Sequence, residues 1–255
     1  MPVIDHDDIV CLFVSMSFGV LLMGFYGMGR VIRPRLPAEH RSREMTEVLL
    51  SVIAMLVTFS AIALGLMLNS SLNKLQHLND LVSGLADHIV RLDDSLVEYG
   101  RDAQLVHVAL ANYTRREVAG LAEDASAPMT RAALQQVESL IIQFDPSDSY
   151  HEMMKRDVLA RYSDVIDVRF RLLSEGGTSS NLPFNLTLGF WLVLTFFVFG
   201  LNSERNLFII VALTVSMCAI VVAIFVILDM DTALGGVISV SPDPLDLALG
   251  QLRQG

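Results

Sequence analysis

Residues Val48 to Leu68 read VLLSVIAMLVTFSAIALGLML and contain no charged side chain. A helix needs about 20 apolar residues to cross the hydrocarbon core of a bilayer, so this stretch predicts a transmembrane helix. Three further stretches have the same character, at 9–28, 184–201 and 207–228. The sequence therefore predicts an all-α, four-helix transmembrane protein with one hairpin over 1–69 and a second over 183–228.

The long segment between the second and third spans, 70–182, has a different pattern. Apolar residues recur there at intervals of three and four, which is typical of an amphipathic helix in a coiled-coil-like arrangement. The register runs through Leu75, Leu78, Val82, Leu85, Ile89, Leu92, Leu96, Tyr99, Ala103, Val106, Leu110 and Tyr113. Gly100 is the expected point of interruption, since glycine costs about 1 kcal/mol inside a helix. Two interpretations stay open, a helix packed within its own bundle and a seam between subunits.

Two later helix starts are marked by capping residues. Ser149, with Glu152 three residues on, predicts the start of a helix through a capping box. In the C-terminal tail, 229–255, Ser241 followed by Pro242 predicts another start, and Asp246 to Leu252 forms a short amphipathic segment. The segment 70–182 is therefore expected to be a helical domain outside the membrane.

Composition excludes several classes of function. The net charge of -10 leaves no basic surface for nucleic acid. The 2 cysteines both lie in apolar stretches, which argues against a disulfide framework and a zinc site. No phosphate-binding loop, nucleophile elbow or metalloprotease histidine pair is present. The protein is therefore expected to be neither an enzyme nor a cofactor carrier.

The distribution of arginine predicts an orientation in the cell's inner (plasma) membrane. The loop 29–44 has one acidic residue before Glu44 and is rich in arginine, at Arg30, Arg33, Arg35, Arg41 and Arg43. Because short cytoplasmic loops are enriched in arginine and lysine, this loop is expected in the cytoplasm. Both termini and the helical insert are then expected on the extracytoplasmic side.

The second span is the candidate for lining an ion pathway. No Asp, Glu, Lys, Arg or His lies deep in any of the four spans, which argues against a proton relay or a pump. A pore of hydroxyl, backbone and apolar groups remains open, with Thr58, Phe59 and Ser60 as pore-lining candidates. The alternative is helix packing through small residues, since Ala54 and Thr58, like Ala61 and Gly65, lie four apart.

The end of the fourth span carries a distinct membrane-boundary motif. Asp229 and Asp231 precede the glycine pair Gly235 and Gly236, which suits a sharp turn at the membrane surface. Two carboxylates could hold a hard cation such as calcium, but further oxygen ligands are missing from the local sequence. A solvated turn is the favoured interpretation.

The chain resembles the bestrophin-like family, distant relatives of the bestrophin anion channels. The resemblance covers most of the chain and is carried by Glu44 to Leu50, by Phe225 to Asp231 (FVILDMD), and by Gly235, Val237 to Pro242 (VISVSP) and Leu245. It implies a helical homo-oligomer, such as a pentamer, around a pathway for small anions. Bestrophins narrow at a phenylalanine-rich neck, whereas the second span here has only Phe59, so neither neck residues nor a calcium clasp carry over. The resemblance also implies a cytoplasmic insert and tails, opposite to the arginine argument.

Two functions follow from these observations. The first is an oligomeric protein of the lipid bilayer that passively conducts small ions, with the second span lining the path. The alternative is a non-conducting membrane sensor or scaffold whose helical insert binds a partner.

Overall fold

The computed structural model describes residues 6–35, 43–123, 127–146, 148–176, 182–202, 207–231 and 240–253. Within these ranges every element is a helix and no strand is present, which confirms the predicted all-α class. The chain forms two compact units. The first comprises Met1–Asn73 and Ser179–Asp231, and the second Lys74–Thr178 and Thr232–Gly255.

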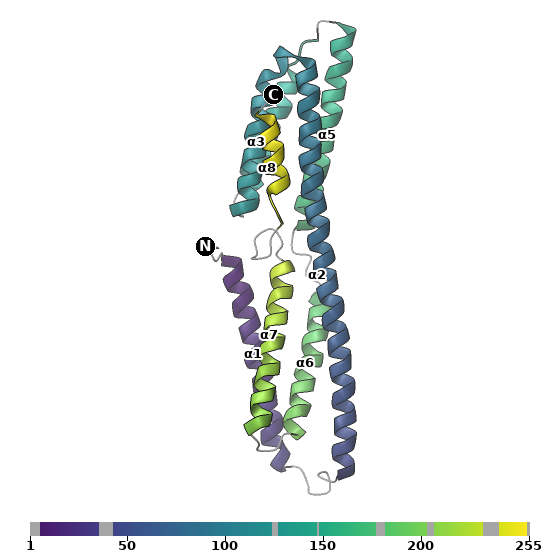
Figure 1. The fold of residues 1–255 in the computed structure, drawn as a ribbon, viewed down its shortest axis with the longest axis vertical. Coiled ribbons are helices and arrows are strands. Elements are labelled where there is room, and N and C mark those ends of the chain that lie inside the picture. The colour runs from purple at the N-terminus through teal and green to yellow at the C-terminus, as the bar shows by residue number, and fades with distance from the viewer. Residues whose placement is uncertain are drawn as a thin grey trace. The chain divides into compact units, whose positions relative to one another are not determined.

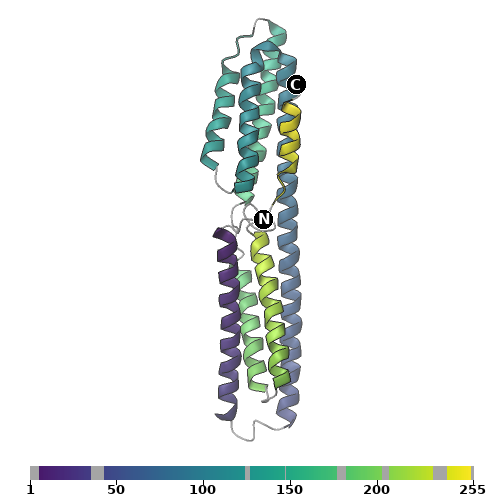
Figure 2. The same cartoon turned by 60° about the vertical axis from the view of Figure 1, so that its left-hand side comes forward.

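The first unit holds the apolar helices. These are α1 (His6–Ile32), the first part of α2 (Arg43–Tyr99), α6 (Leu182–Asn202) and α7 (Leu207–Asp231), with a 3-10 turn, η1 (Arg33–Arg35), after α1. Within this unit the four helices run side by side (Figures 1 and 2). Each of the four predicted spans falls inside one of them.

Within the described part of the chain, three of these helices, α1, α2 and α7, are long and apolar enough to cross a membrane. The described apolar part of α6, Leu186–Asn202, is shorter than a full span. A count of four spans therefore stays a prediction, with α6 as the helix in question.

The surface of the first unit is that of a membrane protein. A small core of apolar side chains joins its helices, formed by Leu22, Tyr26, Met67, Leu188, Leu192, Phe196 and Ile227. Large apolar side chains elsewhere point outward: Phe13 is 73% exposed, Val20 72% and Phe208 78%. Soluble proteins rarely expose apolar patches of this extent. Such side chains are expected to contact the hydrocarbon of a membrane.

The second unit is a helical bundle. It is built from the rest of α2, a 3-10 turn η3 (Arg101–Ala103), α3 (Gln104–Glu123), α4 (Ala127–Ile142), α5 (Ser149–Gly176) and α8 (Asp243–Leu252). The tail helix α8 lies along α3 and buries Leu245, Ala248 and Leu252 in the core of the bundle, and Leu249 is also buried (Figure 1). Asn79 of α2 fixes the start of the tail, since its side-chain oxygen accepts a 3.1 Å hydrogen bond from the Ser241 backbone N–H.

The apolar register of the insert is buried within this bundle. From Leu78 to Tyr113 every member lies in the core, and Leu75 packs against it. This burial supports a helix packed in its own bundle over a seam between subunits. The helix does not run on to Tyr113: α2 ends at Tyr99, and Gly100 follows with φ of 100°, a left-handed backbone that favours glycine.

Two helix starts differ from the prediction by one or two residues. Asp148, rather than Ser149, caps α5, because its carboxylate accepts a 2.8 Å hydrogen bond from the His151 backbone N–H. In α8 the helix begins at Asp243, and the Ser241 hydroxyl accepts from the Asp243 N–H at 3.2 Å.

Candidate functional site

The membrane part of α2 presents two different faces. One face packs into the first unit through Ile53, Leu56, Ser60 and Met67. The exposed side carries a stripe of small or polar side chains that recur at intervals of three and four: Ser51, Ala54, Thr58, Ala61, Gly65 and Asn69. Bulky side chains such as Met55 and Ile62 flank this outward stripe. An exposed small and polar line is suited to contact with water or with another helix.

The three predicted pore residues do not share a face of α2. A helix turns by about 100° per residue, so Thr58 and Ser60 point in nearly opposite directions. Thr58 lies on the outward stripe, and its hydroxyl donates to the Ala54 carbonyl at 2.8 Å. Phe59, between them, packs its ring against Trp191 of α6, with 5.7 Å between centroids. Ser60 is buried, and its hydroxyl has no hydrogen-bond partner among the described residues. That these three residues line a pore stays a prediction.

The membrane-boundary motif is described only in part. α7 continues through Asp231, and Asp229 is buried within the first unit rather than solvated. Gly235 and Gly236 lie outside the described residues. In the part of the chain that the structure describes, no cluster of three or more His, Cys, Asp or Glu side chains could hold a metal ion.

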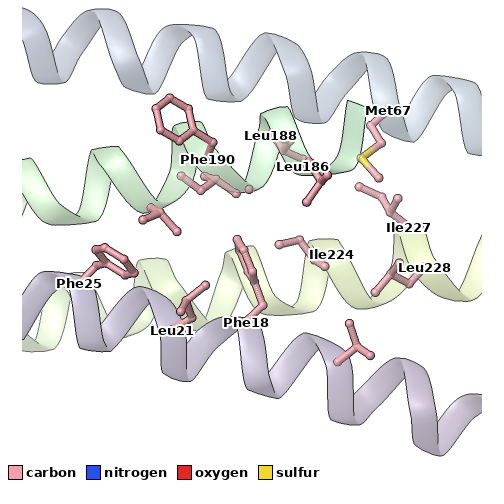
Figure 3. A pocket seen from close by; sticks show the side chains of 14 residues that line it. Phe18, Leu21, Phe25, Met67, Leu186, Leu188, Phe190, Ile224, Ile227 and Leu228 are labelled. Atoms are coloured by element: carbon pink, nitrogen blue, oxygen red, sulfur yellow. The ribbon is translucent and has the colours of Figure 1, made fainter. Parts of the chain in front are cut away.

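An apolar cavity lies inside the first unit, between α1, α6 and α7, with a volume of about 580 Å³. Figure 3 shows side chains from these three helices, together with Met67 of α2, gathered around it. Its floor is formed by the buried Leu188, Leu192 and Ile227, and its rim by exposed residues such as Leu21 and Leu186. Every lining residue is apolar.

A polar cluster is buried in the second unit. Arg169 of α5 donates through Nε to Glu117 of α3 at 3.4 Å, and both side chains are 8% exposed. Burial raises the pKa of the Glu117 carboxyl, although the Arg169 charge opposes the rise. Burial also raises the pKa of the neighbouring Tyr113 hydroxyl well above its ordinary value. Such a cluster links α3 to α5 but presents no nucleophile paired with a base.

Sequence reasoning missed both the cavity and the buried ion pair. The charge pair left no signal, because Glu117 and Arg169 are far apart in sequence and resemble surface charges. For the cavity the sequence contains a weak signal, Gly189 in α6. A methyl group at this position would lie 3.4 Å from the ring of Phe18, so the glycine leaves space beside that ring.

Taken together, the exposed apolar helices and the helical bundle define a membrane protein of the all-α class. A family profile described as the bestrophin-like domain matches residues 20–245. The match covers most of the chain, which therefore belongs to the bestrophin-like family. No curated protein and no solved structure matches the chain.

Proposed function

We propose that the protein is a non-enzymatic, passive ion channel in which several copies surround a pathway for small anions. The outward stripe of α2, from Ser51 to Asn69, is the observation that carries the proposal. It faces away from the rest of its own unit, so it can be covered only by lipid, by another copy or by water. A pore shared by symmetric copies requires one such face from each of them.

The chemistry of the stripe fits passive conduction. The second span has no charged side chain, so nothing in it would hold an ion tightly or relay a proton. Thr58 supplies a hydroxyl while its own donor is satisfied by the helix backbone. The preference for anions rests on the kinship of the family with the bestrophin channels. Of the three predicted pore residues, Thr58 is the one that we assign to the pathway, and Phe59 and Ser60 serve packing.

Thiol accessibility tests the assignment. In a Cys11→Ala/Cys218→Ala background, Thr58→Cys is reconstituted in liposomes and chloride flux is measured with a negatively charged methanethiosulfonate. Only a thiol in contact with water ionises and reacts, so the reagent is expected to stop most of the flux. Thr214→Cys is the matched control, because Thr214 is exposed on α7 and donates to the Ile210 carbonyl at 2.9 Å in the same manner. Flux no greater than in empty liposomes, or equal sensitivity of the two variants, would overturn the proposal.

The alternative, a scaffold whose insert binds a partner, is supported by another observation. The second unit exposes large apolar side chains, with Leu105 70% exposed, Phe170 71% and Leu247 71%. If a partner covers them, purification from membranes would recover it in a fixed ratio, and liposomes would show no chloride flux.

We also propose the orientation that arginine favours, with Arg33 and Arg35 in the cytoplasm and the second unit outside. A cysteine placed at exposed Tyr150 would then react with an impermeant thiol reagent in intact cells. Reaction only after the cells are opened would reverse the orientation and agree with the bestrophins.

A further inference from the structure

The apolar cavity of the first unit is shaped like a slot along the helices. Its lining on α1 consists of Val14, Phe18, Leu21 and Phe25, spaced by four, three and four residues, so the slot follows one face of that helix. We propose that this cavity binds one acyl chain of a membrane lipid. The inference is independent of whether the protein conducts ions.

Water cannot be the occupant of this cavity. A buried water needs two to four polar partners, and an engineered apolar cavity of about 150 Å³ stays dry for lack of them. No lining side chain offers a hydroxyl, amide or charge. An empty slot is also unfavourable, because the side chains around a void lose their van der Waals contacts. A flexible hydrocarbon chain can fill the cavity and make van der Waals contacts with its apolar side chains.

The length of the slot matches one lipid leaflet. From Val14 to Phe25 the α1 backbone rises by about 16 Å, at 1.5 Å per residue. One leaflet contributes half of a hydrocarbon core about 30 Å thick, or about 15 Å. A single extended acyl chain is therefore long enough to fill the slot.

The rim gives the chain a route of entry. Leu21 is 46% exposed, Leu186 66% and Phe190 63%, so the slot opens on the outer surface of the unit. That surface belongs to α1 and α6, whose exposed apolar side chains require lipid around them. The commonest molecule at the opening is thus a phospholipid, and its chain can enter sideways without leaving hydrocarbon.

Photo-crosslinking of the unaltered protein tests the proposal. The protein is reconstituted in vesicles of phosphatidylethanolamine and phosphatidylglycerol with a trace of phospholipid carrying a diazirine on its acyl chain. After irradiation, peptides containing Phe18, Leu21 or Leu192 are expected to carry several times more label than those containing Phe208 or Val215, which are exposed outside the slot. Label spread evenly over exposed apolar residues would overturn the proposal.

A matched pair of variants tests the same slot by volume. Gly189→Leu places a side chain inside the cavity, next to Phe18. Gly24→Leu adds the same side chain to α1 where nothing lies within 4 Å. Phospholipid retained by the purified protein, counted by mass spectrometry, is expected to fall by one molecule per chain in Gly189→Leu alone. Equal retention by both variants would contradict the assignment, and Val193→Phe, about one turn further along the same helix, serves if Gly189→Leu does not fold.

Discussion

Gly29 of α1 and Gly200 of α6 face each other where the backbones of the two helices touch. A methyl group on Gly29 would overlap the carbonyl oxygen of Phe197 and lie 3.1 Å from the Cα of Gly200. A methyl group on Gly200 would overlap the carbonyl oxygen of Tyr26. Backbone atoms cannot turn aside as a side chain can, so this crossing depends on both glycines. Close approach through small residues is a common way of packing helices in membranes.

Replacement of Gly200 by alanine is expected to destabilise the first unit. The added methyl group must push α1 away, and overpacking of this kind costs about 1–3 kcal/mol. The measurement is the free energy of unfolding in detergent micelles. Gly27→Ala on α1 is the control, because nothing lies within 4 Å of the added carbon and alanine favours helix. Equal loss of stability in both variants would show that the close crossing is absent.

Gly100 and Gly84 are expected to respond to alanine with opposite signs. Gly100 has φ of 100° and ψ of -154°, a region open almost only to glycine, so Gly100→Ala costs about 1–3 kcal/mol. Gly84 is inside α2 with nothing within 4 Å, so Gly84→Ala gains about 1 kcal/mol from helix propensity. Hydrogen exchange of the α2 and α3 amides measures both. A gain at Gly100 would mean that α2 runs on as the straight helix that the apolar register alone suggests.

The sequence allows prediction of those features that depend on local periodicity. The uncharged stretch Val48 to Leu68 and the register from Leu78 to Tyr113 both show which side of a helix is apolar, and the structure buries that register. Partners between distant helices leave no such pattern. Neither Gly29 nor Gly200 differs from other glycines in apolar stretches until the two helices are placed together.

The candidate site was less predictable than the fold. Helical geometry alone separates Thr58 from Ser60 by about 200°, so the sequence already held the signal that they cannot line one path. Which of the two faces outward depends on how α2 packs, and only the structure provides that. The apolar cavity depends on the positions of three helices and could not be inferred from any one of them.

The cap of α5 is expected to be lost at low pH. The hydrogen bond from the His151 backbone N–H holds the pKa of the Asp148 carboxyl below its ordinary value of 3.8. A lowered pKa means that the stabilisation is fully present above pH 3.8 and is lost as pH falls through the lower value in the folded state. The chemical shift of the His151 amide should therefore titrate with a midpoint below 3.8. Ser149→Ala is expected to leave this midpoint unchanged, and a midpoint above 3.8 would contradict the cap.

The buried pair of Glu117 and Arg169 is expected to cost more when half of it is removed than when both members are replaced. Glu117→Gln leaves the Arg169 charge buried without its counterion, a change that typically costs about 3–5 kcal/mol. Glu117→Leu combined with Arg169→Met removes both desolvated charges and keeps apolar volume in the same place. The double variant is therefore expected to match the parent protein or exceed its stability by about 1–4 kcal/mol.

Hydrogen exchange of the α3 and α5 amides in the full-length protein measures the stability of the second unit in the parent and in each variant. The exposed pair Arg156 and Glu152, 2.6 Å apart on α5, provides the control. Glu152→Gln there should change stability by less than about 1 kcal/mol, because solvent screens an exposed pair. If the double replacement were as damaging as Glu117→Gln, the pair would be specifying the α3–α5 packing through its hydrogen bond. The cost of burying the two charges would then not decide the stability of the bundle.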